Sequence, residues 1–560
     1  MIKGSAGQLA ASLRAVGAVF ANPDVARLEL AWAGTSFSLW AFAIALGVYA
    51  FDVAGPAAVG IAGLVRLLPG ALASPFAGLL GDRHSRRGVL TACTTATAAV
   101  LGATAAAAAL DAPAALVFAL AGAFTVASSP FVPAEGALYP QVARTPQELS
   151  AANVARGVMD NAGFLVGSTL TGVLLAATTP QVVFGLAAIV AALTALLLAG
   201  VRRDARPEYD EGPELYGVMR QTGLGVRALL EHPGLRLVGA ALVVLAFFEG
   251  TADVLVVVLA LDLLDLGEGG VGYLNASWGI GALAGSAVLA LLLDRGKLAS
   301  GLAAGSVVAG VAAALPGAWP VALAAYAGWF AIGIGFTIIE VTARTLLQRL
   351  GTDELLARVL GSLETSRFAA MAVGSIAASA LVALLGTRGA LLALGAILPL
   401  FAVLRWAPLR AFEVGAPVAE RPYALLRADP IFTPLPVATL ERLSHDVVEL
   451  RVDAGEQIIT QGHHGDRFYL IEDGEVEVFE DRVLRRTEGP GESFGEIALL
   501  RDVPRTATVR ANCPARLLAL DREHFLSAVT GHVRSRTVAD TMIESRLAGA
   551  PGREPVGREQ

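Results

Sequence analysis

Long apolar runs, separated by short polar segments, fill most of the chain up to residue 408. A helix needs about 20 predominantly apolar residues to cross the hydrocarbon core of a membrane. Twelve runs have about that length, and a polar stretch over 201–235 divides them into six and six. The pattern predicts an all-α membrane domain of twelve transmembrane helices. The runs lie near 28–51, 56–80, 88–110, 113–135, 154–177, 180–200, 236–261, 271–293, 298–315, 319–342, 360–385 and 388–408.

The pattern changes completely from Tyr423 onward. Short segments alternate apolar and polar positions, and glycine-containing turns recur at about the 8–12-residue spacing of small all-β domains. The stretch RSRTVADTMIESRL near the end has a helical composition. These features predict a soluble β-roll with flanking helices. The expected domains are a lead-in over 1–27, helix bundles over 28–200 and 236–408, an interdomain loop over 201–235, a linker over 409–422, the β-roll domain over 423–547 and a disordered tail over 548–560.

Loop charges predict the orientation of these helices. Lysine and arginine concentrate on the cytoplasmic side of a membrane, and here they fall in every second loop, with Arg388 as the exception. Both termini are therefore expected in the cytoplasm, in a protein that is integral to the inner (plasma) membrane. The basic loops carry Arg83, Arg86, Arg87, Arg144, Arg202, Arg203, Arg206, Arg220, Arg227, Arg295, Lys297, Arg349 and Arg358.

Composition supports a membrane protein and excludes several other classes. Over 560 residues, 55% are hydrophobic and only 16% are charged, a balance that an ordinary globular protein of this length does not have. The net charge of −7 argues against nucleic acid as a partner. Cys93 and Cys513 give neither a disulfide framework nor metal-ligand spacing, so no metal is expected. No nucleophile–base set is visible, which argues against an enzyme.

The two halves of the predicted membrane domain resemble each other. GLLGDRHSRR after the second run recurs weakly as LLLDRGK after the eighth, and YPQVARTPQEL after the fourth resembles LLQRLGTDELL after the tenth. Such a repeat predicts two similar six-helix bundles, the architecture of many secondary transporters.

The segment GLLGDRHSRR resembles the signature loop between the second and third helices of the major facilitator superfamily, with Ser85 where the family has glycine. The resemblance implies that Asp82, Arg83, Arg86 and Arg87 form a cytoplasmic gate, in which Asp82 pairs with arginines across the interface between the bundles. The alternative is a topological anchor, because the three arginines satisfy the positive-inside rule by themselves.

The fifth run, NAGFLVGSTLTGVLL, resembles the antiporter motif of exporters in the same superfamily. Gly163, Gly167 and Gly172 match the motif, whereas Ser168 and Thr171 depart from it. Small residues at this spacing also allow close helix packing without any role in transport. Together with the gate loop, the motif favours an exporter.

Ionisable residues inside the predicted helices are candidates for coupling transport to protons, because such charges are costly in a membrane and usually face a cavity or a partner. Glu249 and Asp253 are four residues apart and share one helical face. One of two close carboxylates should bind a proton, which suits a proton-coupled antiporter. The alternative is a structural ion pair, for example with Arg66. The candidates are Arg66, Glu135, Asp160, Glu249, Asp253 and Glu340.

The stretch GESFGEIALLRDVPRTATVRA, residues 491–511, has the features of an anion site. Gly491 and Gly495 bracket a turn whose backbone N–H groups can face an anion, and Arg505 adds a delocalised charge suited to phosphate. Glu496 only accepts hydrogen bonds when ionised, so it suits a ribose hydroxyl. Since the Gly-x-x-x-x-Gly-Lys loop of triphosphate sites is missing, the pattern predicts a nucleotide with one phosphate and a free 2′-hydroxyl.

The same stretch closely resembles the phosphate-binding cassette of the cyclic-nucleotide-binding domain, and the resemblance covers about 425–547. It implies that Arg505 and the Ala498 N–H hold the cyclic phosphate, while Glu496 and the Gly495 N–H take the 2′-hydroxyl. The Thr506 hydroxyl can reach the phosphate or a guanine edge, so the base stays open, with cyclic AMP favoured over cyclic GMP. The expected site consists of Phe494, Gly495, Glu496, Ile497, Ala498, Leu499, Arg505, Thr506 and Ala507.

The expected function is proton-coupled export of a small molecule, regulated by a cyclic nucleotide that binds the C-terminal domain. The alternatives are a membrane-anchored receptor that does not transport, and a transporter with the nucleotide as its cargo. No helix-turn-helix follows the β-roll, and no channel filter or arginine-repeat helix is visible. The expected partners are membrane lipid, cargo, the nucleotide and, through the C-terminal domain, a second copy of the chain.

Overall fold

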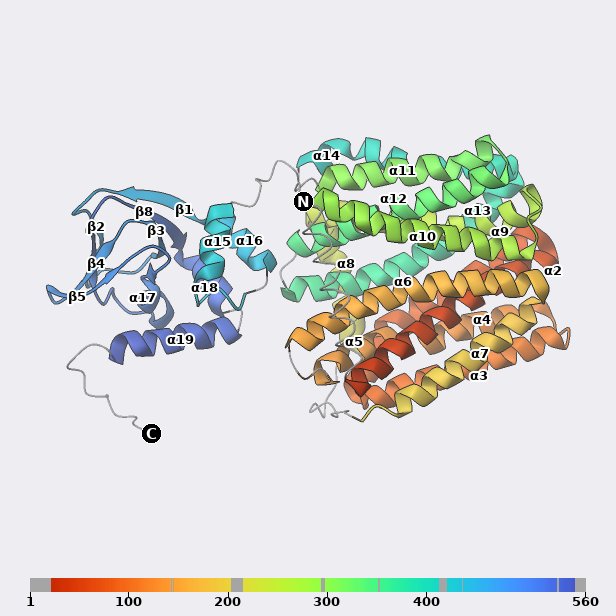
Figure 1. Cartoon of the computed structure of the whole chain (residues 1–560), viewed down its shortest axis with the longest axis horizontal. Helices are drawn as coiled ribbons and strands as arrows, with labels where there is room; N and C mark the ends of the chain where they lie inside the picture. The colour runs from red at the N-terminus through yellow and green to blue at the C-terminus, as the bar shows by residue number, and fades with distance from the viewer. Residues whose placement is uncertain are drawn as a thin grey trace. The chain divides into compact units, whose positions relative to one another are not determined.

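The structure is a computed structural model that describes residues 22–142, 144, 146–202, 215–293, 298–350, 353–411, 420–435, 437–530 and 533–548. The chain divides into two compact units, residues 1–413 and 414–560. In the described residues, the first unit is helical and the second combines two β-sheets with five helices (Figure 1).

The first unit is built from long apolar helices. Nine helices among the described residues are long and apolar enough to cross a membrane. Helix α10, with 26 residues, is a further long helix of similar composition. A π-helical turn over Leu259–Leu263 follows α9. The helices are α2 (Pro23–Arg83), α3 (Arg86–Ala109), α4 (Ala114–Ser128), α5 (Phe131–Val142), α6 (Pro146–Ala177), α7 (Pro180–Ala199), α8 (Leu215–Glu231), α9 (Pro233–Val258), α10 (Glu268–Leu293), α11 (Leu298–Ala318), α12 (Ala322–Leu350), α13 (Asp353–Leu404) and α14 (Trp406–Ala411).

Two of these helices are interrupted by residues with non-helical backbone angles. In α2 the interruption is at Ala54 and Gly55, where Gly55 has φ +65°, and in α13 it is at Gly386, with φ +70°. Glycine adopts such angles without the steric cost that a side chain brings. Near both positions, the sequence pattern predicts that one apolar run ends and the next begins.

Helix α2 begins at Pro23, earlier than the run predicted to start at 28. Asn22 caps it, since the Asn22 side chain accepts a hydrogen bond from the Asp24 N–H at 3.2 Å. Proline is favoured at the first helical position because its missing N–H would have no partner there. The earlier start places Glu29 well inside the helix.

Small residues bring helices of the first unit close together. Helix α2 packs against α13, and α6 packs against α10 (Figure 1). A Cβ on Gly272 of α10 would lie 2.4 Å from the Gly172 backbone of α6, and a Cβ on Gly163 would lie 2.7 Å from Ser36 of α2. These backbones therefore approach as closely as glycine allows.

The second unit is a β-roll of two four-stranded antiparallel sheets, in the orders β1-β8-β3-β6 and β2-β7-β4-β5. Its strands are β1 (Val448–Val452), β2 (Gln457–Ile459), β3 (Arg467–Asp473), β4 (Val476–Glu480), β5 (Val483–Glu488), β6 (Ser493–Phe494), β7 (Thr508–Ala511) and β8 (Ala515–Asp521). Its helices are α15 (Glu420–Ala428), α16 (Val437–Asp446), α17 (Glu496–Arg501), α18 (Arg522–Thr530) and α19 (Val533–Ala548).

Strand β3 is buried on both faces, which explains its continuous apolar run Phe468–Ile471. Phe468 and Leu470 pack against the helices, in a core that includes Phe525. Tyr469 and Ile471 face the space between the two sheets. Successive side chains of a strand point to opposite faces, so a strand between two cores needs apolar residues at every position.

Candidate functional site

The predicted cassette begins where β6 ends. Gly495 has φ +94° and precedes α17, whose first residue is Glu496. A Cβ on Gly495 would meet the Arg505 Nη1 at 2.8 Å. Glycine is therefore required both by the backbone angle and by the closeness of the arginine.

Arg505 is buried beside this turn, with 5% of its surface exposed. Its Nη1 donates to the Gly495 carbonyl at 3.0 Å and its Nη2 donates to the Arg467 carbonyl at 2.7 Å. Asp466, 77% exposed, lies 3.4 Å from Nη2. Burial lowers the pKa of Arg505, but an arginine side chain keeps its charge in proteins. The guanidinium is thus a fixed positive group, partnered mainly by carbonyl oxygens.

Glu496 is also buried, with 1% exposed, and pairs with Arg546 of the terminal helix α19 at 2.5 Å. Arg546 also donates to the Ser493 carbonyl at 2.8 Å and lies 3.5 Å from Glu488. Although burial alone lowers the pKa of Arg546, the carboxylates of Glu496 and Glu488 raise it overall. Arg546, which joins α19 to the cassette, is not among the residues predicted from the sequence.

A pocket brings most of the predicted nucleotide residues together. It is lined by Phe494, Gly495, Glu496, Ile497, Ala498, Arg505, Thr506 and Ala507. Leu499 does not line it and packs in the core between the sheet and the helices. The remaining lining is apolar except for Arg486 of β5, which the sequence analysis also missed; it comprises Ile459, Val478, Arg486 and Val509.

The chemistry of this pocket suits a ligand with an anionic group, a hydroxyl and an apolar part. Arg505 can neutralise the anion, and Glu496 can accept from a hydroxyl. Ile459, Val478 and Val509 offer an apolar wall for a flat ring. Such a combination suits a nucleotide with one phosphate and a free hydroxyl.

In the first unit, the predicted intramembrane charges separate into distinct ion pairs. Glu249 and Asp253 share α9, but each faces a different arginine: Glu249 lies 3.7 Å from Arg367, and Asp253 lies 3.7 Å from Arg66. The two carboxylates therefore do not form one isolated pair.

Arg367 of α13 links Glu249 to a larger network. It contacts Glu340 of α12 at 2.7 Å. Glu340 also pairs with Arg344 at 2.6 Å, and Arg344 pairs with Glu364 at 3.1 Å. The network thus joins α9, α12 and α13. The residues predicted from the sequence do not include Arg344, Glu364 and Arg367. The i,i+4 spacing of Glu340 and Arg344 is a signal in the sequence for one of these pairs.

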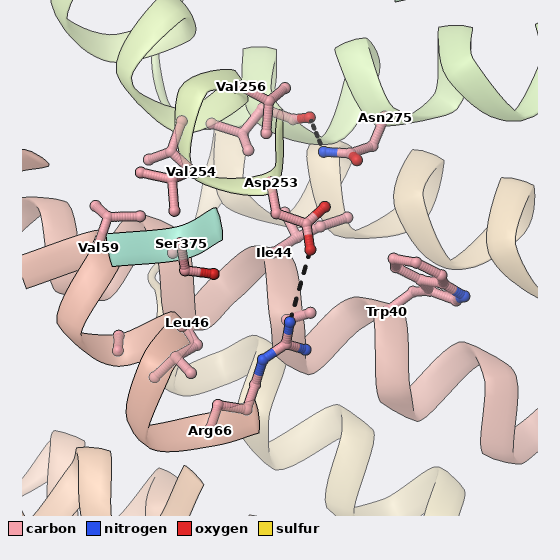
Figure 2. Close-up of a pocket in the computed structure, with 16 residues that line it drawn as sticks. Trp40, Ile44, Leu46, Val59, Arg66, Asp253, Val254, Val256, Asn275 and Ser375 are labelled. Carbon is pink, nitrogen blue, oxygen red and sulfur yellow. Dashed lines mark hydrogen bonds and ion pairs between the residues drawn. The ribbon is translucent and has the colours of Figure 1, made fainter. Parts of the chain in front are cut away.

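A cavity lies around Arg66 and Asp253. Figure 2 shows both side chains reaching into it, with Trp40 and Asn275 beside them. Its walls come from α2, α9, α10 and α13 and are mostly apolar. The labelled lining residues are Trp40, Ile44, Leu46, Val59, Arg66, Asp253, Val254, Val256, Asn275 and Ser375.

The other predicted residues lie among the early helices. Glu135 pairs with Arg156 at 2.9 Å, and the Asp160 carbonyl accepts from Ser36 at 3.5 Å. In the gate loop, Arg86 donates to the Ala137 carbonyl at 3.0 Å.

Arg87 of the gate loop donates to the Val201 carbonyl at 3.0 Å. The side chains of Asp82 and Arg83 lie outside the described residues. Among the residues that the structure describes, no group of three or more His, Cys, Asp or Glu side chains could hold a metal ion.

Comparison with known proteins gives a match for each unit. The sequence profile of the Major Facilitator Superfamily matches residues 30–374, and that of the cyclic nucleotide-binding domain matches residues 449–532. A crystal structure of the nucleoside transporter NupG has a TM-score of 0.57 at 13% identity, covering 69% of this chain and 99% of that one, which is a likeness of fold.

Two curated relatives match a short part of the chain. The cAMP-dependent protein kinase regulatory subunit of Yarrowia lipolytica is 52% identical over 77 residues, which is 14% of this chain and 20% of that protein. The protein of the same name from Eremothecium gossypii is 40% identical over 98 residues, 17% of this chain and 21% of that protein. This chain thus spans about a fifth of the length of either relative.

Proposed function

Because the chain belongs to the Major Facilitator Superfamily and carries a C-terminal cyclic nucleotide-binding domain, we propose that it is a proton-coupled exporter of small molecules whose activity is regulated by cyclic nucleotide. The observation that carries the regulatory part is the pocket that Arg505 and Glu496, both buried, line together. A transporter without a regulatory ligand has no need of such a pocket.

Cyclic AMP is the proposed ligand. Arg505 and the Ala498 N–H hold the phosphate, and Glu496 with the Gly495 N–H takes the 2′-hydroxyl. The 52% identity with a protein named as a regulatory subunit of cAMP-dependent protein kinase supports this choice. Thr506 and Arg486 line the same pocket, and arginine is the commonest partner of guanine, so cyclic GMP is the competitor to test.

Calorimetric titration of the purified full chain with cyclic AMP and with cyclic GMP tests the ligand. We expect cyclic AMP to bind more tightly, and Arg505→Ala to remove binding of both. Tighter binding of cyclic GMP, lost on Arg486→Leu, would assign the domain to the other nucleotide. Absence of binding by a folded wild-type chain would reject the proposal.

For the membrane part we propose twelve crossing segments in two bundles of six, with both termini in the cytoplasm and the chain in the inner membrane. Nine candidate spans, the interruptions at Gly55 and Gly386 and the additional helix α10 support this number. The alternation of basic loops supports the orientation.

The proposed cargo site is the cavity around Arg66 and Asp253, which both early and late helices line. Its apolar walls and single ion pair suit a small, largely apolar molecule with one polar or charged group. The glycines of α6 favour export, as in the motif that they resemble. Proton coupling is proposed from the buried carboxylates of the same unit.

Regulation is proposed to start at Glu496, which already pairs with Arg546 of α19. A ribose hydroxyl that binds Glu496 must share this carboxylate with Arg546, so nucleotide binding alters the attachment of the terminal helix. A ligand shifts a conformational equilibrium only by its differential affinity, and a tenfold shift needs about 1.4 kcal/mol.

Transport in energised inverted membrane vesicles tests regulation. A panel of fluorescent aromatic dyes serves as cargo, with cyclic AMP added on the exposed cytoplasmic face. We expect cyclic AMP to change the uptake rate of wild type but not of Arg505→Ala. Uptake that is the same with and without nucleotide would reject regulation. If the chain binds nucleotide but takes up none of the dyes, with or without a pH gradient, the membrane-anchored receptor is favoured.

A further inference from the structure

A second group of buried charges lies among the early helices, apart from the cavity and the network of α9, α12 and α13. Glu29 of α2 and Glu135 of α5 are both completely buried, with 0% of their surface exposed. Tyr139 of α5 and Arg156 of α6 complete the group. Only Glu135 was a candidate from the sequence.

Each carboxylate has one satisfied oxygen and one orphan oxygen. The Glu135 Oε2 accepts from Arg156 Nε at 2.9 Å, and the Glu29 Oε1 accepts from the Tyr139 hydroxyl at 3.0 Å. The Glu29 Oε2 and the Glu135 Oε1 are buried without a hydrogen-bond partner among the described residues. A buried carboxylate oxygen without a partner is costly when the group is ionised.

The charges around the pair do not balance if both carboxylates are ionised. Arg156 pairs with Glu135 and lies 4.2 Å from the centre of the Trp32 ring. Asp160, one turn further along α6, adds a negative charge rather than a positive one. Arg86 of α3, a cation that also lies near α5, donates to the Ala137 carbonyl. One arginine thus faces two fully buried carboxyl groups within this described cluster.

We propose that Glu29 and Glu135 form a proton-binding pair, in which Arg156 balances one carboxylate and the other carboxyl holds a proton. The pair rests on the proposed proton-coupled function for its role, but its protonation does not require transport. When the bundle opens, the O–H bond of the neutral carboxyl breaks, the proton passes to water, and the new carboxylate competes for Arg156.

The pair differs from the other buried carboxylates in its ratio of acids to bases. Asp253 has Arg66, and Glu249, Glu340 and Glu364 share Arg367 and Arg344. Since Glu364 is half exposed, the buried carboxylates of these groups have as many arginines as acids and can remain ionised together. In the early helices a proton on one of the two fully buried glutamates balances their charge against Arg156, since an uncompensated charge in low dielectric is strongly disfavoured.

Infrared difference spectroscopy of the purified full chain, between alkaline and mildly acidic buffer, counts protonated carboxyl groups directly. We expect Glu29→Gln and Glu135→Gln each to lose one carboxyl equivalent from the protonated C=O band, because the remaining acid pairs with Arg156. Arg156→Gln should gain one equivalent. Asp111→Asn, at an exposed turn between α3 and α4, is the matched control and should leave the buried band unchanged.

Tyr139→Phe provides a milder variant that keeps both acids. In wild type the Tyr139 hydroxyl donates to Glu29 and so stabilises the ionised carboxylate. Without this hydroxyl, the protonated C=O band should titrate at higher pH. Unchanged spectra in both glutamine variants, or no gain in Arg156→Gln, would overturn the pair. Intact titration without pH-driven transport would keep the proton site and reject the coupled function. If transport is driven by a pH gradient but the spectra of both glutamine variants equal that of wild type, the coupled function is kept and the proton site at Glu29 and Glu135 is rejected.

Discussion

Arg505 is oriented before any ligand arrives. Its Nη1 donates a hydrogen bond to the Gly495 carbonyl at 3.0 Å, and its Nη2 donates one to the Arg467 carbonyl at 2.7 Å. A planar guanidinium can satisfy such fixed partners and still present its remaining N–H groups to a phosphate. A lysine ammonium is a point charge on a flexible side chain, and it cannot hold both carbonyl partners and a phosphate in this planar arrangement.

Arg505→Lys should therefore weaken cyclic AMP binding although it keeps the charge. We expect a loss of at least about 2 kcal/mol, roughly thirtyfold in affinity, measured by titration of the full chain. Arg510→Lys is the matched control, because Arg510 is half exposed on β7 and pairs with Glu477 at 3.0 Å. Equal affinities of Arg505→Lys and wild type would mean that the phosphate is held elsewhere.

Asp429 makes the stability of the C-terminal unit depend on pH. Its carboxylate accepts from the Ile431 N–H at 2.8 Å and is 1% exposed. Burial raises its pKa above the usual value of 3.8. The folded unit therefore binds the proton more tightly than the unfolded chain, so the contribution of Asp429 to stability falls as the pH rises from about 3.8 through the raised pKa.

Asp429→Asn should remove that contribution and flatten this part of the stability profile. The unfolding midpoint of the C-terminal unit in the full chain, followed across the acidic range, gives the comparison. Glu488, whose pKa burial also raises, remains in the variant and leaves a residual slope. A profile as steep as that of wild type would show that Asp429 does not titrate differently on folding.

Residues adjacent in sequence were the easiest to predict as a site. Gly495 to Ala498 and Arg505 to Ala507 lie within one short stretch and line one pocket. Arg546 comes 50 residues after its partner Glu496. Nothing in the composition of α19 shows which of its arginines turns toward the cassette, because this depends on how the helix packs.

At the scale of the helices, close contact between α6 and α10 depends on paired glycines. A Cβ on Gly272 would lie 2.4 Å from the Gly172 backbone and 2.7 Å from the Ser168 carbonyl. Both obstacles are backbone atoms and cannot turn aside as a side chain can. The helices would have to separate to admit even one methyl group.

Gly272→Ala should consequently destabilise the membrane unit by about 1–3 kcal/mol, the usual cost of overpacking. Thermal unfolding of the purified chain in detergent measures the effect. Gly185→Ala in α7 is the control, since nothing lies within 4 Å of its added Cβ, and alanine favours a helix. A Gly272→Ala chain as stable as the control would mean that α6 and α10 adjust freely.

Hydropathy located most helices but not their ends or charged partners. It placed breaks close to Gly55 and Gly386, where turn residues interrupt the apolar pattern. It started the first helix at 28, whereas Asn22 and Pro23 form the helix start. Glu29 is not among the predicted intramembrane charges, although the structure buries it completely.

For the whole molecule, the central proposal is that two compact units of one chain influence each other. Coupling between two ligand sites is reciprocal: if nucleotide binding favours one transporter conformation, any ligand of that conformation must change nucleotide affinity by the same factor. The proton is such a ligand if Glu29 and Glu135 bind it. This relation allows the coupling to be measured without knowledge of the cargo.

Glu29→Gln should therefore alter how cyclic AMP affinity depends on pH, although Glu29 belongs to the other unit. Any pH dependence that arises within the nucleotide-binding unit is common to wild type and the variant, so a difference between them comes from the proton pair through the transporter conformation. Titrations of the full chain at several pH values should give a flatter profile for Glu29→Gln, with a difference of up to about tenfold for a coupling of 1.4 kcal/mol. Asp111→Asn is again the matched control. Superimposable profiles of wild type and Glu29→Gln, from chains whose infrared spectra differ, would establish that the proton site exists and that it is not linked to the nucleotide.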